Sequence, residues 1–119
     1  MTPKRVLIAA GGTGGHMFPA RAAADALIAR GWSVKLVTDA RGAKHARDFP
    51  GDGVTEIEAS SPFSKNPVKM AQSVMKLTTG VFQARKILAE YQPHVVAGFG
   101  GYPAFPVLTA AWMNSVPRV

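Results

Sequence analysis

Segments typical of buried strands alternate with segments typical of helices along all 119 residues of the chain. The first strand is expected over 6–10, an unbroken apolar run that leads into glycines. Further strands are predicted over 33–38, 54–58 and 94–97, and the opening of a fifth over 117–119. Helices are predicted over 17–30, 43–49, 68–90 with an interruption at 78–80, and 104–113.

This alternation is typical of a doubly wound α/β fold, in which helices cover both faces of a parallel sheet. The strand order 3-2-1-4-5 is the leading topology. A chain of this length is about one domain. Because the sequence stops where a strand is predicted to start, we expect it to be the front part of a longer protein.

Two glycine-rich segments, GGTGGH (11–16) and GFGGYP (98–103), follow the first and fourth predicted strands. In an open parallel sheet, ligands bind beyond the carboxyl ends of the strands, at the point where the strand order reverses. The order 3-2-1-4-5 puts that point between strands 1 and 4. The two segments are therefore expected to meet at one binding site.

The first segment is neither a P-loop nor a good dinucleotide fingerprint. No lysine lies between Arg5 and Lys35, and Met17 stands where the third glycine of G-x-G-x-x-G belongs. A nicotinamide enzyme is therefore a minor alternative, and Asp39 is expected to have a loop or capping role. Backbone N–H groups at a helix N-terminus can still hold an anion, with the Thr13 hydroxyl as a further donor. A turn that only joins a strand to a helix remains an alternative.

His16 is the candidate general base, because it opens a predicted helix beside the candidate anion site. An imidazole titrates near neutral pH and can take a proton from a hydroxyl group during group transfer. His45 and His94 are interpreted as structural. The chain has no cysteine, and no cluster of His, Asp or Glu has the spacing of a metal site.

The formal net charge of +7, from 14 Lys and Arg against 7 Asp and Glu, indicates an anionic partner. No nucleic-acid-binding signature accompanies this charge, so nucleic acid is not expected. The predicted helix 68–90 is basic and amphipathic, which suits an anionic membrane surface, although an ordinary core-packing helix is an equal alternative. Its candidate membrane contacts are Lys69, Met70, Val74, Met75, Lys76, Leu77 and Val81.

GGTGGHMFPA (11–20) taken together with GFGGYPAFP (98–106) resembles the amino-terminal domain of the MurG family, and the likeness covers essentially the whole chain. These bacterial transferases add N-acetylglucosamine, from UDP-N-acetylglucosamine, to the undecaprenyl-pyrophosphate-linked muramyl-pentapeptide of peptidoglycan synthesis. The resemblance implies the GT-B arrangement of two Rossmann-like domains. In it, residues 1–119 are the acceptor-binding domain, and the donor domain is absent from this chain. The isolated chain is then expected to be inactive.

The resemblance also implies a role for each matching residue. His16 is the base for the acceptor's C4 hydroxyl in an inverting transfer that uses no metal or other cofactor. The helix over 68–86 docks on the cytoplasmic face of the inner membrane as a peripheral contact, although Val81 and Phe82 stand where a larger aromatic is expected. The residues lining the sugar and diphosphate site are Gly12, Thr13, Gly14, Gly15, Gly100, Gly101 and Tyr102. A non-catalytic Rossmann-like module that binds an anion or a membrane is the alternative.

Overall fold

The computed structural model of the chain describes residues 3–12, 14–59 and 65–119. Within these residues, a parallel sheet of four strands has the order β3-β2-β1-β4. Its strands are β1 (Arg5–Ala9), β2 (Ser33–Thr38), β3 (Val54–Glu56) and β4 (Val95–Gly98). The helices are α1 (Gly14–Ala29), α2 (Ala40–Ala43), α3 (Pro67–Tyr91) and α4 (Ala104–Met113).

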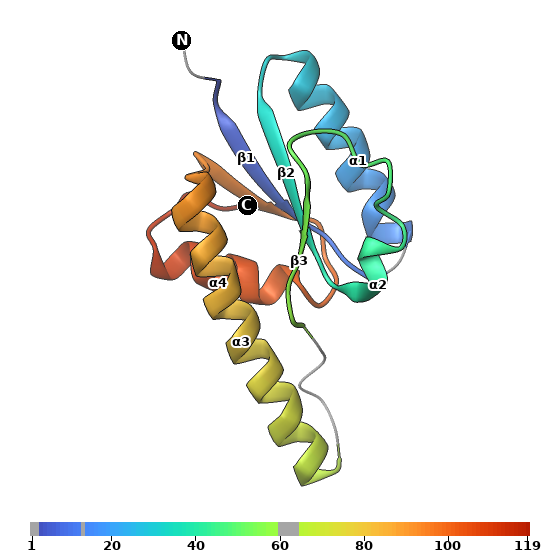
Figure 1. The fold of residues 1–119 in the computed structure, drawn as a ribbon, viewed down its shortest axis with the longest axis vertical. Coiled ribbons are helices and arrows are strands. Elements are labelled where there is room, and N and C mark those ends of the chain that lie inside the picture. Colours follow the sequence, from blue (N-terminus) through green and yellow to red (C-terminus); the bar gives the residue numbers. More distant parts are fainter. Residues whose placement is uncertain (1–2, 13, 60–64) are drawn as a thin grey trace.

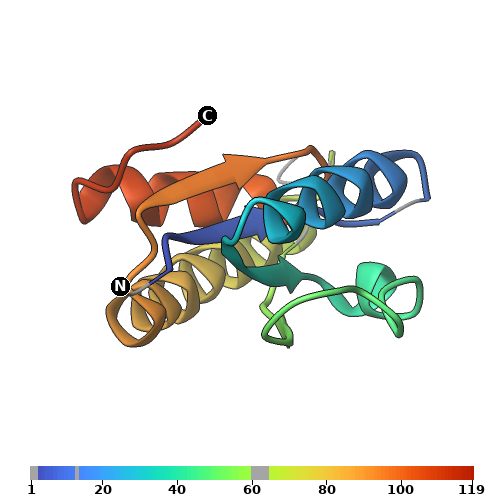
Figure 2. The same ribbon diagram turned by 90° about the horizontal axis from the view of Figure 1, so that it is seen from above.

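The observed topology confirms the predicted doubly wound sheet. β1 pairs in parallel with both β2 and β4, and the strands point toward the end of the sheet at which α1 begins (Figure 2). A parallel bridge between Val96 and Arg118 places the start of the fifth strand beside β4. The strand order therefore follows the predicted 3-2-1-4-5.

Residues of β1 alternate between two buried clusters on opposite faces of the sheet. Leu7 and Ala9 pack with α3 and α4, whereas Val6 and Ile8 pack with α1 (Figure 1). Burying a Leu or Ile side chain stabilises a fold by about 1.5–3 kcal/mol, so a strand buried on both faces contributes at every position. This strand is the centre of the core.

α1 begins at Gly14, three residues before the predicted start at Met17. Gly14, Gly15 and His16 therefore form the first helical turn, and Pro19 lies inside the helix rather than in its first turn. The apolar periodicity used for the prediction starts only at Met17, which is buried. Gly15 and His16 before it are not buried, so they show no helical pattern of apolar residues.

The helix predicted over 43–49 is wrong, since α2 spans Ala40–Ala43 and turns follow it. The Asp39 carboxylate caps α2 by accepting the Gly42 N–H at 2.8 Å, so the helical turn starts directly after β2. Ala46 and Phe49 are buried against the α1 side of the sheet from irregular backbone. Their apolar spacing therefore reflects packing of a loop and not a helical face.

β3 ends at Glu56, two residues before the predicted end. The Glu58 N–H donates to the side-chain oxygen of Gln83 on α3 at 2.7 Å, and it makes no bond to a neighbouring strand. A side-chain acceptor from a distant helix thus ends the strand. Alternation of apolar and polar residues could not reveal that partner.

The predicted interruption at 78–80 is also wrong, because α3 runs without a break from Pro67 to Tyr91. The hydroxyl groups of Thr78 and Thr79 donate to the carbonyl oxygens of Val74 and Met75 within the helix. Gly80 is buried, and a Cβ on it would overlap the carbonyl oxygen of Glu58. The glycine therefore permits close approach to the end of β3, and it does not end the helix. The first half of α3 projects beyond the rest of the molecule (Figure 1).

Replacement of Gly80 by Ala sets two effects against each other. Ala is favoured over Gly in a helix interior by about 1 kcal/mol, whereas a methyl group forced against the Glu58 carbonyl costs about 1–3 kcal/mol. Because the contacting atom belongs to the backbone and cannot swing away, we expect Gly80→Ala to lower the free energy of unfolding. Urea unfolding followed by circular dichroism measures it, with the exposed Thr78→Ala as a control that leaves stability unchanged or raises it. A more stable Gly80→Ala would show that the two segments separate without penalty.

Candidate functional site

The turns that follow β1 and β4 meet at the carboxyl edge of the sheet, as the sequence predicts. The Phe99 N–H donates to the Ala9 carbonyl oxygen at 2.8 Å, and the Gly11 N–H donates to the Gly100 carbonyl oxygen at 3.2 Å. These bonds continue the β1–β4 ladder past the last paired residues. The two glycine segments therefore lie side by side.

Several of the glycines are required by this contact itself. A Cβ on Gly11 would overlap the ring of Pro103, and a Cβ on Gly101 would lie 2.8 Å from the Gly11 carbonyl oxygen. Gly100 and Gly101 also have φ values of +101° and +87°, which side-chain-bearing residues rarely adopt. Close packing between the two segments, against the Pro103 ring at Gly11 and against backbone at Gly101, thus accounts for these two glycines without any ligand.

His16 lies across this junction in the first turn of α1. Its Nδ1 is 3.2 Å from the Phe99 carbonyl oxygen, and a Cβ on Gly100 would lie 2.7 Å from Nδ1. A carbonyl oxygen can only accept a hydrogen bond, so Nδ1 carries the hydrogen in this contact. In the neutral ring Nε2 then keeps its lone pair, which is the form that a general base needs.

The backbone donors near the site divide into two groups. The Gly11 N–H is bonded to Gly100, and the Gly12 N–H points at the Asp39 Oδ1 at 3.4 Å. In contrast, the N–H groups of the first turn of α1, which includes Gly14, Gly15 and His16, have no acceptor within the helix. An anion is therefore expected at the first turn of α1 and not at the Gly12 N–H. Thr13 lies outside the described residues.

Tyr102 follows the second glycine turn, and its side chain is exposed at the same edge. A hollow of about 370 Å³ lies at the carboxyl ends of β2 and β3. Its charged and amide lining residues are Asp39, Glu56, Glu58, Lys76 and Gln83. Carboxylates and a lysine therefore flank the glycine junction on the β2–β3 side.

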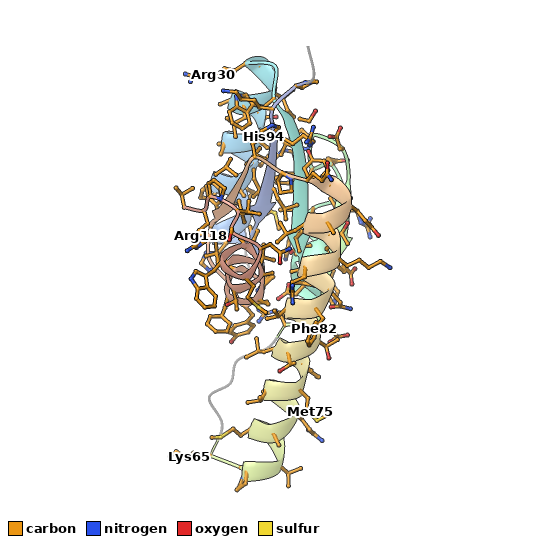
Figure 3. The ribbon with its side chains drawn as sticks, turned by 90° about the vertical axis from the view of Figure 1, so that its left-hand side faces the viewer. Arg30, Lys65, Met75, Phe82, His94 and Arg118 are labelled. Atoms are coloured by element: carbon orange, nitrogen blue, oxygen red, sulfur yellow. The ribbon has the colours of Figure 1, made fainter. Side chains whose placement is uncertain are left out.

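The candidate membrane contacts on α3 differ in exposure. Lys69, Met70, Val74, Met75 and Lys76 are exposed, Leu77 is half-buried, and Val81 packs against the buried core cluster. Figure 3 shows Met75 and Phe82 at successive levels along α3, and their side chains are 70% and 61% exposed.

The sequence analysis missed the apolar face of α4. Phe105, Leu108, Thr109 and Trp112 line a hollow of about 310 Å³, and the Trp112 side chain is 64% exposed. The spacing i, i+3, i+7 of its three apolar residues was the available signal. No helix among the described residues is long and apolar enough to cross a membrane.

Two other histidines and a half-buried tyrosine lie away from the junction. The His94 Nδ1 accepts the Arg5 N–H at 3.0 Å, which confirms a structural role, and His45 is exposed. At the amino end of the sheet, burial and then the Asp52 carboxylate raise the pKa of Tyr91, whose hydroxyl donates to Asp52 at 3.1 Å. Among the described residues, no three His, Cys, Asp or Glu side chains are grouped as a metal site requires.

Known proteins are similar to this chain in sequence and in fold. The chain is 67% identical, over 93% of its length, to the "UDP-N-acetylglucosamine--N-acetylmuramyl-(pentapeptide) pyrophosphoryl-undecaprenol N-acetylglucosamine transferase" of Maricaulis maris, of which it spans 30%. It is 51% identical over 96% of its length to the transferase of the same name from Sinorhizobium fredii, of which it spans 31%. The crystal structure of MurG from Acinetobacter baumannii superposes on 98% of the chain, with a TM-score of 0.79 and 28% identity, and the match covers 34% of that protein.

The chain thus spans about a third of the length of these relatives. Residues 6–119 match the model of the glycosyltransferase family 28 N-terminal domain. A match over almost the whole chain, together with the glycine junction at the β1–β4 switch point, establishes the relationship. The chain therefore belongs to glycosyltransferase family 28, through that family's N-terminal domain.

Proposed function

We propose that residues 1–119 form the acceptor-binding domain of a two-domain GT-B enzyme. The enzyme transfers N-acetylglucosamine from UDP-N-acetylglucosamine to an undecaprenyl-pyrophosphate-linked muramyl-pentapeptide in peptidoglycan synthesis. The names of the Maricaulis maris and Sinorhizobium fredii relatives support this substrate pair. The observation that carries the proposal is the position of His16 at the junction of the two glycine segments, where its Nδ1 contacts the Phe99 carbonyl oxygen at 3.2 Å.

In this reaction the C4 hydroxyl oxygen of the acceptor sugar attacks the anomeric carbon of the donor. The bond between that carbon and the diphosphate oxygen breaks, and UDP leaves with the electron pair, so the configuration inverts. The Nε2 of His16 takes the hydroxyl proton as the new bond forms. The Phe99 carbonyl oxygen, which accepts the Nδ1 hydrogen, holds the ring in place and favours the imidazolium that results.

The first turn of α1 supplies the diphosphate site. Its N–H groups, which have no acceptor within the helix, and the positive end of the helix dipole attract an anion, and Gly14 and Gly15 let the phosphate oxygens approach the backbone. A P-loop lysine stabilises a phosphoryl group during its transfer. Here the bond that breaks lies at a sugar carbon, so such a lysine is unnecessary. Gly100, Gly101 and Tyr102 form the opposite wall of the site, and Gly12 contributes through its backbone conformation.

We also propose that the enzyme binds the cytoplasmic face of the bacterial inner membrane as a peripheral protein. The projecting half of α3 carries exposed Met70, Val74 and Met75 beside Lys69 and Lys76. Apolar side chains that enter the lipid boundary and lysines that contact anionic headgroups act together in such binding. The exposed Phe105 and Trp112 side chains of α4 would extend the apolar membrane-binding surface beyond α3.

Replacing His16 tests the catalytic proposal in the full-length enzyme. In His16→Asn, the side-chain amide can still donate to the Phe99 carbonyl, but no group remains to accept the hydroxyl proton. We expect kcat to fall by about 100-fold or more, the range of general acid–base catalysis, with little change in the KM for UDP-N-acetylglucosamine. Transfer of a radiolabelled sugar to a lipid-pyrophosphate acceptor measures this.

His45→Asn is the matched control, because His45 is exposed away from the junction, and it should leave kcat unchanged. Near-normal turnover of His16→Asn would assign the proton acceptance to another residue and leave GGTGGH as a binding segment. A wild-type enzyme that binds the acceptor but transfers no sugar would favour the non-catalytic anion- or membrane-binding module.

Met75→Asp tests the membrane surface. It removes the most exposed apolar side chain of the projecting half of α3 and places a negative charge near anionic headgroups. We expect binding to vesicles of anionic phospholipid to weaken by about tenfold, because apolar insertion and electrostatic attraction are both reduced. Vesicle sedimentation at low and high salt measures the effect.

Ile28→Asp is the control, because Ile28 lies near the carboxyl end of α1 and not on α3. This variant should bind vesicles as the wild type does. Trp112→Ser tests whether α4 belongs to the same surface, and a loss comparable to that of Met75→Asp is expected. Unchanged vesicle binding in both Met75→Asp and Trp112→Ser would contradict the proposed docking surface.

A further inference from the structure

Asp39 connects the segment after β2 to the first glycine segment. Its side chain is only 5% exposed. The Oδ1 atom accepts the Gly42 N–H at 2.8 Å and faces the Gly12 N–H at 3.4 Å. One carboxylate oxygen thus bridges the first turn of α2 and the segment that leads into α1.

The two segments also touch directly through their backbones. Gly42 is buried, and a Cβ on it would lie 3.2 Å from the Gly11 Cα and would overlap the Thr38 hydroxyl. Gly11 is thereby enclosed between Gly42 on one side and Gly101 with Pro103 on the other. Only glycine at position 42 lets α2 come this close, which brings the Asp39 carboxylate within reach of Gly12.

The Gly12 position needs such a partner. Gly12 has a φ of +78° and no atom within 4 Å of the place where a Cβ would stand. A glycine loses more conformational freedom on ordering than any other residue, and it has no side chain whose packing could offset that loss. The Asp39 contact is the side-chain interaction that restrains this residue within the described structure.

We propose that Asp39 is a positioning residue, which holds Gly12 so that the first turn of α1 and His16 face the acceptor. This inference rests on the proposed function for its catalytic consequence. Two backbone N–H groups face the Oδ1 of Asp39, which is the arrangement of a residue that holds backbone in place. Its role beyond capping α2 lies in the weaker of the two contacts, the one to Gly12.

Asp39→Ser separates the two contacts. A serine is as good an N-cap as aspartate, so its hydroxyl can keep the bond to Gly42, but it is one atom shorter and does not reach Gly12. In the full-length enzyme we expect the thermal midpoint to change little and the KM for the lipid-linked acceptor to rise about tenfold. The KM for UDP-N-acetylglucosamine should stay within about twofold, because the other domain holds most of the donor.

Asp39→Asn is the rescue variant, because its amide oxygen occupies the place of Oδ1 and can accept both N–H groups. It should restore the acceptor KM toward the wild-type value. Asp48→Ser is the matched control, since Asp48 is exposed on the same connection and should leave both KM values unchanged.

Amide hydrogen exchange gives a readout that does not depend on activity. The backbone amides of Gly11, which donates to Gly100, and of Gly12, which faces Asp39, should exchange faster in Asp39→Ser than in the wild type, and Asp39→Asn should restore their protection. If the acceptor KM and this exchange are both unchanged in Asp39→Ser, or if the acceptor KM falls because the freed Gly12 N–H binds the diphosphate, the inference is wrong. An inactive wild-type enzyme would contradict the proposed function alone, and the exchange measurement would still decide whether Asp39 restrains the loop.

Discussion

Gly11 donates its N–H to the Gly100 carbonyl oxygen at 3.2 Å, and the remaining site geometry depends on this approach of two chain segments. It follows from the pairing of β1 with β4, which brings segments almost ninety positions apart in sequence to one edge of the sheet. Both segments must lack side chains at the contact, because a Cβ on Gly11 or Gly101 would enter the other segment. The position of His16 over the Phe99 carbonyl is a consequence of this contact.

The glycines of GGTGGH consequently have two different tasks. Gly11 and Gly12 have their N–H groups directed at protein acceptors, so they shape the junction and contribute no free donor. Gly14 and Gly15 lie in the first turn of α1, where the N–H groups have no helical acceptor. Structural packing accounts for the first half of the motif, and the proposed anion site uses only the second half.

The parts of the fold that the sequence predicted are those with a periodic signal. The run from Val6 to Ala10 indicated a central strand buried on both faces, and the two glycine segments indicated the switch point beside it. Two of the errors fall where a side-chain contact decides the local structure: Gln83 on α3 accepts the Glu58 N–H beyond the end of β3, and the Asp39 cap starts α2 three residues earlier than predicted. The contact of the Phe99 carbonyl with His16 could not be predicted, because a backbone acceptor carries no residue signature.

The first half of α3 forms a helix although it packs against little of the hydrophobic core. Its buried residues are Gly80, Ala84, Ile87 and Leu88, so the half that precedes Gly80 contacts little of the domain. An isolated helix shorter than about 12–15 residues is marginal in water. The projecting half is therefore held mainly by continuity with the packed half and by the Asn66 cap, which accepts the Val68 N–H at 2.9 Å. An amphipathic lipid boundary would stabilise this half by taking up its methionines and valine. Ordering of this half of the helix would then be coupled to the proposed docking on a membrane.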